Sequence, residues 1–264
     1  MVFGAMILIW INSCNKENAP YVTQPTNEIH LQIAVNHIIM GDPLNFDTLL
    51  YKTSTGNQYM VSDLQYFISG IRLHLKDRKW IYVNQDKDIH YVDARNEKTF
   101  KWNLPVADGL TDVDSVSFVF GLDEDNNISG RFPDPPERDM FWPEMLGGEY
   151  HYMKMNLKWK KPGETETRPF MFHLGIGQMY QGTTTNPDSI IGFIQNYFVV
   201  SSPFFFKNPD TKDLSMIINM NIERWFDGKY EFVFADYPNG IMQDQEGMFK
   251  AAQNGRKVFD IKVK

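Results

Sequence analysis

The sequence predicts an all-β domain, an antiparallel β-sandwich with one or two short helices. Three observations lead to this fold class: alternation of apolar and polar residues in short segments, turn residues between those segments, and few helical patterns. A chain of 264 residues with 42% hydrophobic side chains can bury a sizeable core, and all-β sandwiches of this size often form one domain. We therefore expect a single domain over residues 29–264.

The expected strands come at short intervals along the chain. In the first of them Ile29, Leu31 and Ile33 point one way, with His30 and Gln32 opposite. The second and third strands form an expected hairpin, and the sixth and seventh form another. In order, strands are predicted at Ile29–Asn36, Tyr66–Leu75, Trp80–Val83, Ile89–Val92, Ser115–Phe120, Tyr150–Trp159, Phe170–Leu174, Leu214–Ile222 and Val258–Val263.

Helical signals are confined to the C-terminal part of the chain. The segment from Ile241 to Asn254 carries acidic residues early, apolar residues at helical spacing, and an Asn254-Gly255 stop. The segment from Asp188 to Tyr197 fits a short helix or a strand equally well. We expect one helix at the first position and leave the second open.

The N-terminus is typical of an exported bacterial lipoprotein. Residues 5–11 form an uninterrupted apolar run, too short to span a bilayer but suited to a signal peptide. Ile11-Asn12-Ser13-Cys14 resembles a lipobox, and Cys14 is the only cysteine, so no internal disulfide competes for it. We expect a signal peptide at 1–13, a tether at 14–28 lipidated on Cys14, and a place in the cell envelope as an outer-membrane lipoprotein. The alternative is a frayed apolar terminus with a free thiol.

Composition and motifs exclude several classes of function. The net charge is −7 and no block of Lys and Arg occurs, which speaks against a nucleic-acid partner. There is no Gly-x-Ser-x-Gly motif for a serine nucleophile, and the only cysteine belongs to the lipobox. With no assignable nucleophile, base or cofactor loop, we predict that the protein is not an enzyme.

Two histidines near the ends of a predicted hairpin are candidate metal ligands. Alternation places His151 in one row with Met153 on the strand Tyr150–Trp159. His173 lies on the neighbouring strand, so pairing of the two strands could bring both imidazoles to its open end. Neutral imidazoles bind copper and zinc, and thioethers favour Cu(I). The alternative is structural: core methionine, and buried histidine bonded to a backbone carbonyl.

An acidic loop offers a second candidate metal site. Asp123, Asp125 and Asn127 match the first, third and fifth positions of a calcium-binding loop, and Asp134 falls at the twelfth. The sixth position carries Ile128 where such loops need glycine. Asp and Asn are also common turn residues, so calcium is the less favoured metal.

An ordered set of motifs resembles the MbnP-like copper-binding domains. Residues 63–73 resemble a strand of that family, and Phe118 to Asn127 resembles its next segment. Residues 139–150, with Met140-Phe141-Trp142, resemble a third motif, and Phe172-His173-Leu174-Gly175 a fourth. The likeness runs from about Ile29 to the C-terminus in the family's order.

This resemblance implies an exported β-sandwich that binds copper, often as a lipoprotein of Gram-negative bacteria. It implies Trp142 as a residue that could be oxidised to kynurenine, with a haem-containing enzyme of unspecified identity as the partner that would oxidise it. His173 matches a motif position. The sequence departs from the family at Asn126-Asn127, where methanotroph members have a histidine, and it lacks their extra cysteines.

Together these observations predict an exported lipoprotein that binds copper for acquisition or handling, without turnover. The expected metal site contains His151, His173, Trp142 and Met153. The alternative is a surface-exposed glycan- or protein-binding β-sandwich that has lost the metal. Histidines that face apart, with an exposed row of aromatic residues, would favour this alternative.

Overall fold

The computed structural model describes residues 29–49, 51–76, 79–83, 88–106, 112–182, 186–206, 213–238 and 240–263. The predicted signal peptide, the tether and Cys14 lie outside the described residues. Within them the chain is mostly β-strand and forms open, largely antiparallel sheets consistent with a sandwich. No helix in these ranges is long and apolar enough to cross a membrane.

The strands are β1 (Ile29–Ile39), β2 (Asp42–Pro43), β3 (Tyr51–Lys52), β4 (Gln58–Leu75), β5 (Trp80–Tyr82), β6 (Ile89–Asp93), β7 (Lys101–Val106), β8 (Val113–Phe120), β9 (Met153–Lys160), β10 (Arg168–Leu174), β11 (Gly177–Tyr180), β12 (Ile190–Ile194), β13 (Phe198–Phe206), β14 (Asp213–Asn221) and β15 (Phe259–Val263). The helices are the α-helix α1 (Gln245–Gly255) and the short 3-10 turns η1 (Glu97–Thr99), η2 (Glu137–Met140), η3 (Glu144–Leu146), η4 (Pro187–Ser189), η5 (Ile222–Trp225) and η6 (Phe234–Asp236).

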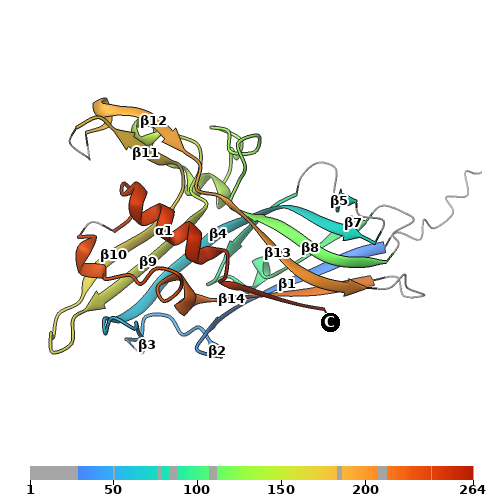
Figure 1. The fold of residues 1–264 in the computed structure, drawn as a ribbon, viewed down its shortest axis with the longest axis horizontal. Coiled ribbons are helices and arrows are strands. Elements are labelled where there is room, and N and C mark those ends of the chain that lie inside the picture. The colour runs from blue at the N-terminus through green and yellow to red at the C-terminus, as the bar shows by residue number, and fades with distance from the viewer. Residues whose placement is uncertain are drawn as a thin grey trace, which may run out of the picture.

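The long strand β4 is the central strand of the larger sheet. This sheet has the order β10-β9-β4-β8-β13, and β3, β5 and β6 also pair with β4. The smaller sheet has the order β15-β14-β1-β2, with β7 paired to β1. In Figure 1, β9, β10, α1 and the β11–β12 hairpin gather at one end of the molecule, away from β1, β7 and the C-terminus.

Aromatic side chains join the two sheets in the core. The ring of Phe259, on the smaller sheet, lies 5.4 Å from that of Phe118 and 5.2 Å from that of Phe120, both on the larger sheet. Phe118 and Phe120 are fully buried. Phe118 and Phe120 therefore place one face of β8 in a core that the two sheets share.

The predicted fold class is confirmed. Each predicted strand is present, although its first or last residue differs from the prediction. The two expected hairpins pair as β4–β5 and β9–β10. The pairing of β1 with β14 is parallel, and β7, β11 and β13 were not predicted. The segment Asp188–Tyr197, left open, contains the end of η4 and then β12. Helix α1 begins at Gln245, later than expected, because the Asp244 side chain accepts a hydrogen bond from Gly247 N and caps it there.

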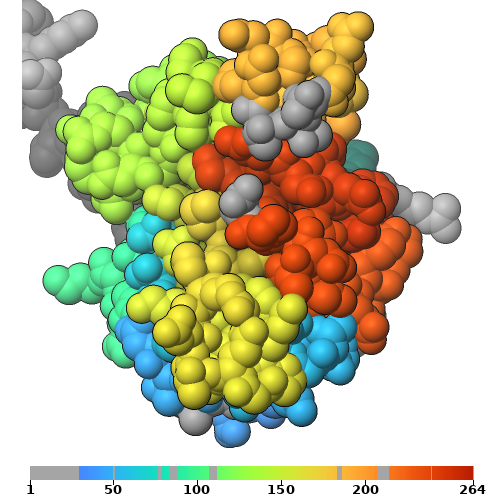
Figure 2. Space-filling view, turned by 90° about the vertical axis from the view of Figure 1, so that its left-hand side faces the viewer, coloured from blue at the N-terminus to red at the C-terminus, as the bar shows by residue number. Residues whose placement is uncertain are grey.

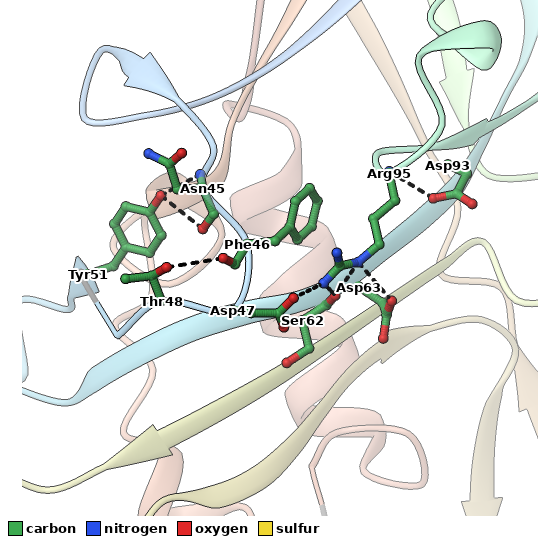
Figure 3. A network of polar contacts seen from close by, with 9 residues as sticks. All are labelled: Asn45, Phe46, Asp47, Thr48, Tyr51, Ser62, Asp63, Asp93 and Arg95. Carbon is green, nitrogen blue, oxygen red and sulfur yellow. Dashed lines mark hydrogen bonds and ion pairs between the residues drawn. The ribbon is translucent and has the colours of Figure 1, made fainter.

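A polar network around Arg95 ties the loop before β3 to β4 and to the loop after β6 (Figure 3). The Arg95 Nε donates to the carbonyl oxygen of Ser62 at 2.8 Å and lies 3.3 Å from the Asp63 carboxylate. Its terminal nitrogen also donates to the Asp47 carboxylate. Because these donors already face protein oxygens, the network serves to hold the loops.

Candidate metal centre

The β9–β10 pairing brings His151 and His173 together. The two ring centroids lie 5.2 Å apart with an interplanar angle of 78°. Both side chains are buried, with exposed fractions of 5% and 6%. The expected meeting of these imidazoles at the end of the hairpin is thus present in the structure.

The geometry that brings them together differs from simple alternation. His173 pairs with Lys154 on β9, so it shares the face of Lys154 and not that of Met153. His151 lies before β9 begins, and the chain bends at Tyr152. Because of this bend, His151 does not share a face with Met153 as alternation predicts, and its ring lies against that of His173.

Each imidazole has one nitrogen held by the protein and one without a partner. His151 Nδ1 lies 2.9 Å from the carbonyl oxygen of Met140, which can only accept, so Nδ1 carries the proton. His173 Nε2 lies 2.8 Å from Asn156 Oδ1 and donates to it in the same way. His151 Nε2 and His173 Nδ1 are buried and have no hydrogen-bond partner. These two nitrogens carry free lone pairs.

Burial keeps both rings neutral. Desolvation lowers the pKa of His151 from its ordinary value of 6.5 to about 4. Desolvation, followed by the influence of His151 and Lys154, lowers the pKa of His173 to about 3. Near neutral pH neither free nitrogen is therefore blocked by a proton, which is the state that metal binding requires.

Trp142 forms a wall of the same site. Its fully buried indole lies 4.5 Å from the His151 ring, centroid to centroid, in an edge-to-face contact. The indole Nε1 donates to the Leu146 carbonyl oxygen at 3.2 Å. The indole packs against Gly175, where a Cβ atom would meet its ring carbons at 2.7 Å. Glycine at this position makes room for Trp142 beside His151.

Met153 is placed elsewhere. It pairs with Leu174 on β10 and with Tyr66 on β4, so its side chain shares their face of the larger sheet. His173 lies on the opposite face. The structure therefore does not bring Met153 to the two free nitrogens, and we leave it out of the site.

The acidic loop forms a turn stabilised by its own side chains. Asp123 Oδ1 accepts hydrogen bonds from the backbone and side-chain nitrogens of Asn126. Asn127 Oδ1 accepts from the backbone N of Tyr150 at 3.0 Å, which orients this oxygen toward the protein. Across the described parts of the chain, no group of three or more His, Cys, Asp or Glu could hold a metal ion. Asp125 and Asp134 are not gathered with the others into a cation site.

The donor set at the histidine pair fits a soft or borderline ion held by few ligands. An imidazole nitrogen binds such a metal at about 2.0 Å, which puts the ion roughly 3 Å from each ring centre. The observed 5.2 Å between ring centres is compatible with one shared ion. Structural zinc sites use four protein ligands, which this pair does not supply.

Sequence reasoning missed Asn156 and the Met140 carbonyl group, which fix the tautomers of the two histidines. A signal for Asn156 was available: alternation along β9 places it on the same face as Lys154, the partner of His173. The Met140 carbonyl group carries no sequence signal, because its direction depends on the η2 turn and on the hydrogen bond that it accepts from the backbone N of His151 at 2.7 Å.

Comparisons with known proteins point to one family. A family model described as MbnP matches residues 28–243. Among solved structures, MbnP from Methylosinus trichosporium is similar with a TM-score of 0.52 and 14% sequence identity, covering 89% of this chain and 99% of that chain. At this identity the likeness concerns the fold. No curated protein matches.

Proposed function

The chain belongs to the MbnP family, and on this premise we propose that it is an exported lipoprotein that binds copper without catalytic turnover. His151 and His173 are the ligands. The observation that carries the proposal is the pair of free, neutral nitrogens, His151 Nε2 and His173 Nδ1, on two buried rings in edge-to-face contact.

The hydrogen bonds behind the ligands support this role. Metal-binding histidines usually donate their second ring nitrogen to a carbonyl or carboxylate, which fixes the tautomer and the ring direction. Here the Met140 carbonyl oxygen serves His151 and Asn156 Oδ1 serves His173. A buried nitrogen without a partner also costs free energy, on the order of 1–3 kcal/mol, which metal binding would offset.

Copper suits the donors better than the other common ions. Calcium and magnesium prefer oxygen ligands, and the described site offers nitrogen. Imidazole binds copper well, and the affinity order of divalent ions peaks at copper. Because the two rings are in contact and do not point apart, the geometry favours metal binding over the glycan- or protein-binding alternative.

Trp142 lines the site in the proposal without being a ligand in its unmodified form. Its Nε1 donates to the Leu146 carbonyl oxygen, and its ring makes an edge-to-face contact with the His151 ring. Oxidation of this residue to kynurenine, implied by the family resemblance, would change the hydrogen-bonding groups beside His151. Peptide mass spectrometry of the native protein, covering Trp142, tests whether the modification occurs.

Export as a lipoprotein rests on the sequence at Cys14. Labelling with a radioactive or clickable fatty acid in a Gram-negative host should mark the wild-type chain and leave Cys14→Ser unmarked. Equal labelling of both chains, or of neither, would remove this part of the proposal without affecting the metal site.

A Cu(I) competition titration tests the metal site. We expect one ion per chain, and a loss of affinity of at least about 100-fold, or ~2.7 kcal/mol, in His151→Gln and in His173→Gln. His74→Gln is the matched control, since His74 pairs with Asp114 on the surface, outside the site. Circular dichroism checks that all variants fold. Wild-type affinity in both site variants would overturn the proposal.

A further inference from the structure

A second site lies beside the proposed metal centre. A partly open cavity of about 860 Å³ is lined by β10, β11, the loop residues 236–238 and 240–243, and the start of α1. Its volume falls in the range of small-molecule sites. In Figure 2 the C-terminal segment (red) lies between the β11–β12 hairpin (orange) and the yellow segment that contains β10.

Two glycines allow the walls of this cavity to pack closely against their neighbours. Gly240 has a φ of 77°, and a Cβ there would meet the Met171 backbone at 2.3 Å. The loop can therefore lie against the edge of β10, where Ile241 N donates to the Met171 carbonyl oxygen at 3.0 Å. A Cβ on Gly177 would overlap the side chain of Gln245.

The Gln245 side chain is locked by its neighbour. Its amide exchanges two hydrogen bonds with the amide of Asn196, at 3.0 and 3.1 Å. The close backbone contact at Gly240 and the mutual hydrogen bonds of Gln245 and Asn196 limit the motion of the cavity walls. The site is therefore preformed, because its walls are ordered before a ligand binds.

In the wall of the cavity, the side-chain oxygen of Gln178 accepts no hydrogen bond. This side chain is 1% exposed. Its Nε2 donates to the carbonyl oxygens of Leu146 and Ile176, at 2.8 and 2.7 Å, so both amide hydrogens are used and the direction of the amide is fixed. Gln178 Oε1 is buried and has no hydrogen-bond partner, and neither does the Tyr180 hydroxyl. Both residues line the cavity.

The charge of the lining is negative. Asp236, Asp244 and Glu246 contribute carboxylates, and none of the described lining residues is Lys or Arg. Lys250 pairs with Glu246 at 2.7 Å and offsets one of these charges. The N-terminus of α1 adds a partial positive charge of about one half, which is smaller than the remaining carboxylate charge.

We propose that this cavity binds a small organic cation carrying primary ammonium groups. An ammonium group supplies the donor that Gln178 Oε1 lacks and a positive charge for the carboxylates of the lining. The thioethers of Met171 and Met242 and the ring of Tyr237 provide apolar surface for an alkyl chain. A metal ion suits the cavity less well, because its carboxylates do not form a cluster that could hold one.

The cavity is joined to the metal centre by one carbonyl group. The Leu146 oxygen accepts hydrogen bonds from both Gln178 Nε2 and Trp142 Nε1. A cation that bonds to Gln178 Oε1 polarises this amide and thereby strengthens the bond that its Nε2 donates to Leu146. The environment of Trp142 therefore changes with occupancy of the cavity.

Calorimetric titration of the metal-free chain with spermidine tests the proposal. We expect saturable binding that weakens with salt, and a shift of the Gln178 side-chain amide signals in the NMR spectrum. The double variant Asp236→Asn/Asp244→Asn should bind about tenfold more weakly, or ~1.4 kcal/mol. Asparagine remains a good N-cap, so the second change keeps the start of α1.

Asp42→Asn/Glu166→Gln is the matched control, since it removes the same charge from two exposed positions outside the cavity lining. This control should bind spermidine like the wild type. No saturable binding, an equal loss in the control, or an unshifted Gln178 amide at saturation would each overturn the proposal. A crystal structure grown with spermidine that shows only water at Gln178 Oε1 would do the same.

Discussion

The Trp142 indole meets the His151 imidazole edge to face, with ring centroids 4.5 Å apart and an interplanar angle of 63°. His151 offers its free Nε2 in the same buried space. Trp142 is therefore a built-in reporter of the proposed metal centre, since an ion bound to His151 lies next to its ring.

We expect copper to quench tryptophan fluorescence, and Trp142 to carry most of the change. In Trp142→Phe the quenching amplitude should fall by more than about half, while the stoichiometry stays at one ion per chain. Trp80→Phe is the control, because Trp80 is 43% exposed on β5, outside the site. Undiminished quenching in Trp142→Phe, measured by steady-state emission, would place the metal elsewhere.

The orientation of His173 by Asn156 should matter for affinity. Asn156→Leu removes the acceptor of the 2.8 Å bond to His173 Nε2 and frees the ring to adopt the other tautomer. Loss of such a supporting partner typically lowers metal affinity about 10- to 100-fold. Lys158→Leu, on the same face of β9, controls for the added apolar side chain and should bind copper like the wild type. Competition titrations that find no difference between these variants would remove Asn156 from the site.

Local pattern was sufficient for most of the fold. Alternation located β1 and β9, since each buries one face, whereas β4 and β8 are buried on both faces over part of their length. It could not give the parallel register of β1 with β14, because that pairing joins segments far apart in the chain. The segment Asp188–Tyr197 stayed open because a 3-10 turn and a short strand follow each other within it.

The candidate site was predictable in its residue types but not in its geometry. Strand pairing placed His173 next to the end of β9, as expected. Alternation alone grouped His151 with Met153, and the bend at Tyr152 breaks that grouping. The carbonyl groups of Met140 and Leu146 set the tautomer of His151 and the direction of Trp142. Backbone carbonyl directions are a tertiary property, which residue types do not encode.

Gly175 should be intolerant of any side chain. In Gly175→Ala the new Cβ meets the Trp142 ring at 2.7 Å, and overpacking of this kind costs about 1–3 kcal/mol. Displacement of the indole should also lower copper affinity, through His151. Gly163→Ala is the control: its φ is 84° and no atom lies within 4 Å of the added Cβ, so only a backbone cost of roughly 1 kcal/mol is expected. Urea unfolding at equilibrium gives both values, and equal destabilisation would contradict the steric argument.

The stability of the metal-free protein should fall in mild acid because of His37. This residue is buried between the rings of Tyr66 and Phe100, and its Nε2 lies 3.0 Å from the Tyr66 hydroxyl. Burial lowers the pKa of His37 from 6.5 to about 4. Between these values the unfolded chain takes up a proton that the folded chain does not, so the free energy of unfolding falls as the pH falls, by about 1.4 kcal/mol per pH unit.

His37→Gln removes this proton uptake. The variant should lose less stability than the wild type between pH 6.5 and 4, and the gap in their slopes should equal about one proton. His151 and His173 titrate in both proteins, so their contributions cancel in the difference. Tyr66→Phe removes the hydrogen bond but keeps the imidazole, and it should retain the wild-type slope. Chemical denaturation across this pH range supplies the slopes; if His37→Gln and the wild type run parallel, His37 is already protonated in the folded protein, or its pKa is unshifted, and the burial argument fails.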